Sequence, residues 1–225
     1  MQATEPVDPG PGTFPLGDED RTLLPKVELE LEVREGGPEG PVRERKTFAA
    51  NLATENLVDV MRTLYEGQEW SQYTTNGVSL TDRDGNGRGV NIFGQQYVAG
   101  DDDSSDWIFC SSQYSDHLHE IAVGDGGGST VTPQRDGNDL TNRLGSAQID
   151  EPASLGDDAF AISATIVNTS GAAWTVREVG FYHEWAYGNE YDHGTAHFLT
   201  LWDAVSSVNV PDGDAVSVQY TMRWP

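Results

Sequence analysis

The sequence is poor in lysine and cysteine, and it contains no long apolar run. Lysine occurs only as Lys26 and Lys46 among 13 basic residues, whereas 37 residues are acidic and the formal net charge is −24. The single cysteine, Cys110, excludes a disulfide within the chain. No stretch approaches the roughly 18 consecutive apolar residues of a membrane-spanning helix. We therefore expect no membrane partner and no disulfide framework.

The charge balance also narrows the class of partner and the environment. Phosphate binding depends on Lys and Arg contacts that release counterions, so a chain this acidic is not expected to bind nucleic acid. Many carboxylates with almost no lysine are typical of proteins adapted to molar salt. There the Debye length falls to about 3 Å, and repulsion between surface carboxylates is screened. The composition predicts a halophilic source.

The first 25 residues differ in composition from the rest of the chain. They contain five prolines among scattered glycines and acids, and too few apolar residues to form a packed unit. They also lack the basic start and apolar run of a signal peptide, which predicts synthesis in a cytoplasm. We expect residues 1–25 to form an extended docking arm and residues 26–225 to form one folded domain.

Periodicity predicts a mainly β domain with one helix. The stretch KVELELEV (26–33) alternates apolar and acidic residues, as a half-buried antiparallel strand does. A helix is expected near 52–66, with Thr54 as its N-cap, and a second, short helix at DLTNRLG (139–145). Strand patterns separated by Gly, Asn and Asp turns dominate the remainder, most clearly in the last third. The predicted architecture is an antiparallel β-sandwich, jelly-roll-like, with one covering helix.

The glycine-rich stretch IAVGDGGGSTVTPQRDGNDL (121–140) raises three alternatives, namely a phosphate loop, a calcium loop and a plain turn. A nucleotide loop needs a Lys or Arg for the phosphates and a helix directly after the turn. Here Ser129 to Pro133 continue in an extended pattern, and Pro133 disfavours helix at Thr132. We therefore interpret Gly124 to Gly128 as a turn.

Two groups of residues are candidate metal ligands. In TDRDGNGRG, Asp82, Asp84 and Asn86 alternate as in the first half of a calcium loop, but Phe93 stands where the bidentate Glu of an EF-hand belongs. An Asp/Asn/Gly hairpin turn is the favoured interpretation, with a bound Ca or Mg ion as the alternative. His117 and His119 share a face of an expected strand and offer two ligands for zinc. No cofactor is required by any motif.

An aromatic insertion near 183–197 is the candidate recognition element. Trp185, Tyr187 and Tyr191 supply rigid amphipathic contact area in a stretch that contains glycine. Packing against a neighbouring subunit is favoured over stacking on a sugar. No Ser-His-Asp or Cys-His order is present, and carboxylates alone select no catalytic site in so acidic a chain. We do not expect an enzyme.

The order of several motifs resembles a family of structural proteins from tailed viruses. The motifs are EIAVGDGGGSTVTPQRDGNDLTNRL, then EVGFY (178–182), and then a final strand after PDGD (211–214). The resemblance covers roughly residues 47–225. It implies a virion protein found in tail, baseplate, fibre or capsid turret and decoration components, here of a virus that infects haloarchaea.

The resemblance implies a protein that docks and does not catalyse. We expect a closed homo-oligomer of three, five or six copies that forms a ring or spike, because one repeated contact generates closed symmetry. Its partners would be itself, other virion proteins and host surface glycans, and its place would be the virion. The alternative is a carbohydrate-binding β-sandwich module of a halophile, which would be monomeric.

Overall fold

The computed structural model describes residues 26–50, 53–66, 78–90, 119–129, 131–134, 136–150, 152–156, 158–188 and 193–223. Among the described residues the fold is mainly β with one α-helix, and the strands pair antiparallel. The mainly β, antiparallel fold with one short helix is therefore confirmed. The expected arm, residues 1–25, lies outside the described residues.

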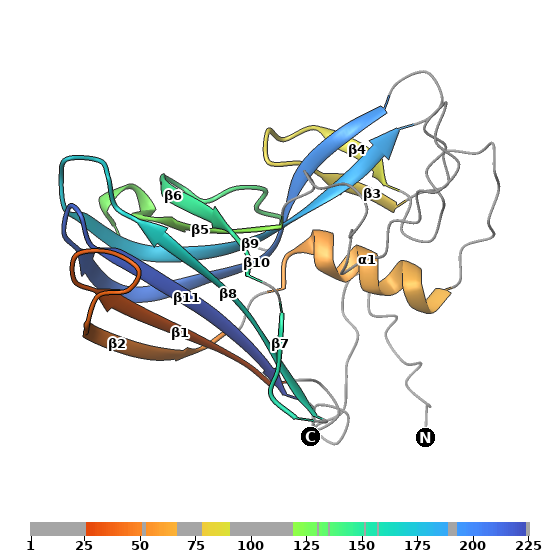
Figure 1. Cartoon of the computed structure of the whole chain (residues 1–225). Coiled ribbons are helices and arrows are strands. Elements are labelled where there is room, and N and C mark those ends of the chain that lie inside the picture. Colours follow the sequence, from red (N-terminus) through yellow and green to blue (C-terminus); the bar gives the residue numbers. More distant parts are fainter. Residues whose placement is uncertain are drawn as a thin grey trace, which may run out of the picture.

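The first sheet places the first and last described strands side by side (Figure 1). Leu29 of the first strand is paired with Tyr220 of the last, so the two ends of the domain close on each other. In spatial order its strands are β2 (Val42–Ala49), β1 (Lys26–Arg34), β11 (Ala215–Arg223), β8 (Ala159–Val167) and β7 (Ala153–Ser154).

The second sheet is built around the long strand β9 (Trp174–Gly188). One edge of β9 pairs with β5 (Glu120–Gly124) and, further along, with β4 (Gly87–Val90), while the other edge pairs with β10 (His193–Val210). The register of β10 shifts twice, between Leu199 and Leu201 and between Ala204 and Val208. The remaining strands of the second sheet are β3 (Val78–Thr81), which pairs with β4, and β6 (Arg143–Gln148), which pairs with β5.

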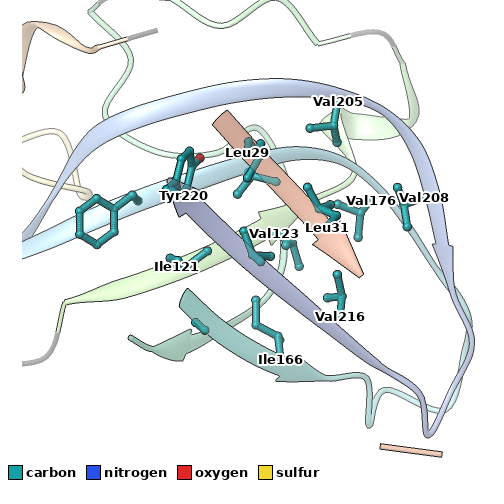
Figure 2. Packing of buried hydrophobic residues seen from close by; sticks show 14 of the residues in the cluster. Leu29, Leu31, Ile121, Val123, Ile166, Val176, Val205, Val208, Val216 and Tyr220 are labelled. Carbon is teal, nitrogen blue, oxygen red and sulfur yellow. The ribbon is translucent and has the colours of Figure 1, made fainter. Parts of the chain in front are cut away.

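The main core lies between the two sheets and follows from alternation along the strands. Leu29, Leu31 and Val33 of β1 are buried on the inner face, opposite Ile121 and Val123 of β5 (Figure 2). Each such side chain contributes about 1.5 to 3 kcal/mol when it is fully buried. The predicted strand at 26–33 is confirmed, with its apolar residues facing inward.

Helix α1 (Glu55–Glu66) is anchored at its start to the second sheet. Ala53 forms an isolated bridge with Leu201, and the Thr54 hydroxyl donates to the Leu199 carbonyl at 2.6 Å. Thr54 directly precedes the first helical residue, and its carbonyl accepts from the Val58 N–H at 3.2 Å, as the predicted N-cap position requires. Val60 is fully buried on the helix face that packs against β3 and β10. No helix among the described residues is long and apolar enough to cross a membrane.

The short helix expected at 139–145 was wrong. Leu140 belongs to a small cluster on the outer face of the second sheet, whereas Leu144 packs against the main core. Strand β6 begins at Arg143 and pairs with β5. The four-residue spacing of the two leucines reflected contacts on opposite faces of a sheet, which a helical pattern cannot distinguish in so short a run.

Candidate functional site

The best-defined polar site lies on the outer face of the second sheet, where residues 125–142 cross over β9 and β10. We call residues 125–142 the connecting segment; Thr130 and Arg135 within it lie outside the described residues. It joins β5 to β6, which pair with each other, so it is a long hairpin connection. Beneath it lie four buried residues, Ala122, Tyr182, Leu199 and Trp202, against which Leu140 of the segment itself packs.

Glu178 holds both ends of the connecting segment. Its side chain is fully buried, and Oε1 accepts hydrogen bonds from the backbone N–H groups of Gly126 and Asn142, each at 3.2 Å. Oε2 accepts from the Trp202 indole Nε1 at 3.0 Å. A buried carboxylate is costly unless its oxygens are bonded, and three donors meet that requirement here. Glu178 is therefore an architectural carboxylate that ties the segment to β9.

Tyr182, four residues further along β9 on the same face, holds the segment close to its junction with β6. Its hydroxyl donates to Asp139 Oδ1 at 2.5 Å and accepts from the Leu140 N–H at 3.1 Å. Burial and the neighbouring Asp139 carboxylate raise the pKa of the Tyr182 phenol. Together Glu178 and Tyr182 bind the segment at three points.

Gly137 allows the segment to lie directly on Trp202. A Cβ added at this glycine would overlap the Trp202 ring. The Trp202 indole is thus enclosed between Gly137 above it and the Glu178 carboxylate that accepts its N–H. The motif EVGFY and the glycine-containing segment are consequently two halves of one packing unit.

The glycine run forms a tight turn, as interpreted from the sequence. Gly126–Gly128 is a single 3-10 turn whose three glycines all have positive φ. The N–H of Gly127 is bonded to the Asp125 carboxylate at 2.8 Å, and that of Gly126 to Glu178. Carboxylates of the chain itself thus occupy the backbone donors that a phosphate loop would offer to its ligand.

The structure brings Asp82 and Asn86 together but leaves Asp84 exposed in the β3–β4 turn. Asp82 Oδ1 accepts from the Asn86 N–H at 2.7 Å, and Oδ2 accepts from Arg88 Nε at 2.8 Å. Burial works to raise the pKa of Asp82, but these bonds and the Arg88 charge lower it overall. The guanidinium occupies the position beside the carboxylate that a cation would take.

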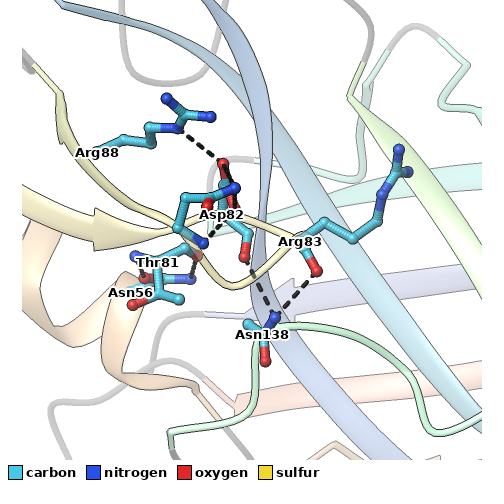
Figure 3. A network of polar contacts seen from close by, with 7 residues as sticks. Asn56, Thr81, Asp82, Arg83, Arg88 and Asn138 are labelled. Atoms are coloured by element: carbon cyan, nitrogen blue, oxygen red, sulfur yellow. Dashed lines mark hydrogen bonds and ion pairs between the residues drawn. The ribbon is translucent and has the colours of Figure 1, made fainter.

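The β3–β4 turn is also joined to the helix and to the connecting segment. Asn56 of α1 donates to the Thr81 carbonyl and accepts from the Thr81 N–H, both at 2.9 Å (Figure 3). Asn138 Nδ2 donates to the carbonyls of Asp82 and Arg83 at 3.3 and 2.9 Å. Sequence reasoning did not single out Asn56 or Asn138, because an asparagine has no pattern that reveals a long-range partner.

The histidines assemble differently from the expected pair. His117 lies outside the described residues, whereas His119 stacks edge to face on His183 with ring centroids 4.8 Å apart. His183 Nδ1 lies 2.9 Å from the Thr200 hydroxyl, which donates to the Phe181 carbonyl. Burial and the neighbouring His119 lower the pKa of His183. Within the described part of the chain, no group of three or more metal-ligating side chains is present.

The stretch expected as an aromatic insertion continues the two longest strands. Trp185 is paired with Ala196 and Tyr187 with Gly194, so the backbones of Trp185 and Tyr187 belong to the β9–β10 hairpin. Tyr191 lies outside the described residues. Figure 1 shows this hairpin rising away from the first sheet, beside β3 and β4.

Comparison of the chain with models of protein families, with curated proteins and with solved structures finds no match.

Proposed function

We propose that the chain is a virion structural protein of a halophilic tailed virus, which docks as a ring or spike on the particle as a closed homo-oligomer of three, five or six copies. The observation that carries the proposal is that the polar residues of the EVGFY motif hold the fold together. The side chains of Glu178 and Tyr182 form hydrogen bonds with the connecting segment. Motif residues of an enzyme would instead point reactive groups at a substrate.

The buried polar groups of the site support the same conclusion. The Glu178 carboxylate meets three donors of the chain and has no solvent exposure, so it is not placed to exchange protons with a ligand. A glycoside hydrolase would need two carboxyl groups converging on one cleft, about 5 to 10 Å apart. The buried Glu178 is closed over by the connecting segment. The carboxylate chemistry therefore favours assembly over catalysis.

The net charge of −24 is consistent with a protein that functions in molar salt. Hydrated carboxylates keep a particle surface soluble in molar salt, where screening removes their mutual repulsion. We place the chain on a halophilic virion for this reason and for the order of its motifs. The host-surface glycans expected from the sequence remain partners of the assembled ring or spike.

A mass-spectrometric inventory of purified particles, with heads separated from tails, tests the proposal. We expect the chain in one of the two fractions at a fixed ratio to the major structural proteins. Sedimentation in molar KCl should show a closed oligomer. A stable monomer in molar salt, together with absence from the particles, would replace the proposal by the carbohydrate-binding alternative.

A further inference from the structure

Basic side chains from three elements converge on Glu120, on the outer face of the second sheet. Arg83 Nη1 lies 3.0 Å and Arg143 Nη2 lies 2.5 Å from Glu120 Oε1, and His197 Nε2 lies 3.9 Å from the same oxygen. Arg83 belongs to the β3–β4 turn, Arg143 begins β6 and His197 lies on β10. Two guanidinium groups thus share one carboxylate in a chain where acidic residues outnumber basic ones 37 to 13.

The Glu120 cluster differs from other ion pairs in its number of carboxylates. Arg43 lies 2.9 Å from Asp214 and 3.6 Å from Glu35, so that one cation meets two carboxylates. Glu32 is also shared by two arginines, Arg34 and Arg45, but Arg45 additionally lies 3.8 Å from Glu30. One guanidinium of the Glu120 cluster is left without a matching carboxylate among the described residues.

Both guanidinium groups are held in place before any ligand arrives. The backbone N–H of Arg83 donates to the His197 carbonyl at 2.9 Å, and the backbone carbonyl of Arg83 accepts from Asn138. These two bonds fix the turn that carries the Arg83 side chain, and Glu120 holds its guanidinium group. Figure 3 shows the Arg83 side chain extending away from the turn. The Arg143 guanidinium lies over the Tyr182 ring, 5.1 Å from its centroid. A pre-positioned guanidinium loses little side-chain entropy when it binds an anion.

The cluster remains reachable from solvent although Glu120 is nearly covered. The side chain of Arg83 is 35% exposed and that of Arg143 is 20% exposed, against 13% for Glu120. Burial works to raise the pKa of Glu120, but the bond to Arg143 and the charges of Arg143 and His197 lower it overall. Glu120 therefore stays ionised and positions both guanidinium groups. Arg143 Nη2 is buried, so Arg83 is the more accessible of the two.

We infer that Arg83, supported by Arg143, is a docking point for a carboxylate side chain of a partner protein; this inference rests on the proposed function. Two strongly acidic proteins repel each other over most of their surfaces, so an attractive polar contact requires a place where cations are in local excess. A guanidinium binds a carboxylate through two parallel N–H donors. Molar salt screens the long-range field but leaves such a direct contact in place.

Substitution of Arg83 tests the docking point on the full chain. Tagged Arg83→Gln and Arg45→Gln are produced in the virus-producing cells and are quantified by mass spectrometry in purified particles. Arg45 is the matched control, because it is 58% exposed, is ion-paired with Glu32 and lies on the other sheet. We expect Arg83→Gln to lower incorporation about tenfold relative to Arg45→Gln, the size of effect that follows from loss of a charge-assisted hydrogen bond.

The outcomes separate the inference from the proposed function. Equal incorporation of the two variants overturns the docking point and leaves the proposed function standing, whereas absence of the wild-type chain from particles overturns both. If Arg83→Gln fails to fold, Arg83→Lys keeps the charge without the bidentate geometry, and its wild-type incorporation would overturn the inference. The Arg83 Nε–H nuclear magnetic resonance signal should shift with a glutamate-containing peptide. A shift with glucuronate alone would make an acidic sugar the ligand and overturn the protein partner.

Discussion

Glu178 and Trp202 are joined by a 3.0 Å hydrogen bond beneath the connecting segment, at a place where the carboxylate is fully buried. This bond links β9 to β10 at the same carboxylate that binds Gly126 and Asn142. The outer face of the second sheet therefore depends on one buried carboxyl group that meets three donors. The arrangement makes the stability of a long connection sensitive to a single side chain.

Glu178→Gln should destabilise the fold strongly. The amide supplies one acceptor oxygen in place of two, and its NH₂ group opposes a donor, so that a buried N–H loses its partner. We expect a loss of about 2 to 4 kcal/mol in the free energy of unfolding, measured by urea denaturation in molar KCl. Glu35→Gln, at an exposed carboxylate, serves as the control and should change stability by less than about 0.5 kcal/mol. Equal effects would contradict the architectural role of Glu178.

Tyr182→Phe should loosen the connecting segment near its junction with β6 and leave the main core intact. The substitution removes the donor to Asp139 and one of the two acceptors of the Leu140 N–H, which we expect to cost about 1 to 2 kcal/mol. Hydrogen exchange should accelerate at Leu140 and not at Leu29, which lies in the main core. Unchanged exchange at Leu140 would show that the hydroxyl does not hold the segment.

The folded protein should lose stability as the pH falls below about 6.5, the ordinary pKa of histidine. Burial and the neighbouring His119 lower the pKa of His183, so the unfolded chain binds a proton that the folded chain excludes. The contribution of His183 is complete above the unfolded pKa and is lost progressively as the pH falls towards the folded pKa. His183→Asn should flatten the dependence of the thermal midpoint on pH between 7 and 5. An equally steep dependence in the variant would assign the acid sensitivity to other groups.

The β3–β4 turn should hold its structure without a divalent ion. Because Asn86 and Arg88 bond both oxygens of Asp82, we expect the same thermal midpoint in calcium and in a chelator. Asp82→Ala should lower that midpoint under both conditions, and Asp84→Ala should leave it unchanged under both. A chelator-dependent effect of Asp84→Ala would instead support the Ca or Mg site considered from the sequence.

Dilution from molar KCl into low salt should lower the thermal midpoint. The chain has 37 acidic and 13 basic residues, and repulsion between its carboxylates grows as the Debye length increases from about 3 Å at 1 M to about 10 Å at 0.1 M. Differential scanning calorimetry at a series of KCl concentrations measures the shift. A midpoint independent of salt would contradict the halophilic interpretation.

The sequence alone determined the first strand, its buried face and the main helix. In KVELELEV the apolar residues recur every second position, which assigns Leu29, Leu31 and Val33 to one face whatever the strand pairs with. The helix near 52–66 was predicted in the same way from helical spacing and is confirmed as Glu55–Glu66. Alternation is a property of neighbouring residues, and for that reason it can be read without the fold.

Only the tertiary structure decided what the polar residues do. Glu178 binds donors 36 and 52 positions away, and the three basic side chains around Glu120 come from different elements. In a chain with 37 acids no local pattern separates a buried carboxylate from a solvated one. Leu140 and Leu144 were misassigned to a helix for a related reason, since their spacing is local but the faces they contact are set by the pairing of β6 with β5. Hydrogen bonds and ion pairs between distant segments depend on sheet register and loop path, and both are fixed by packing of the whole domain.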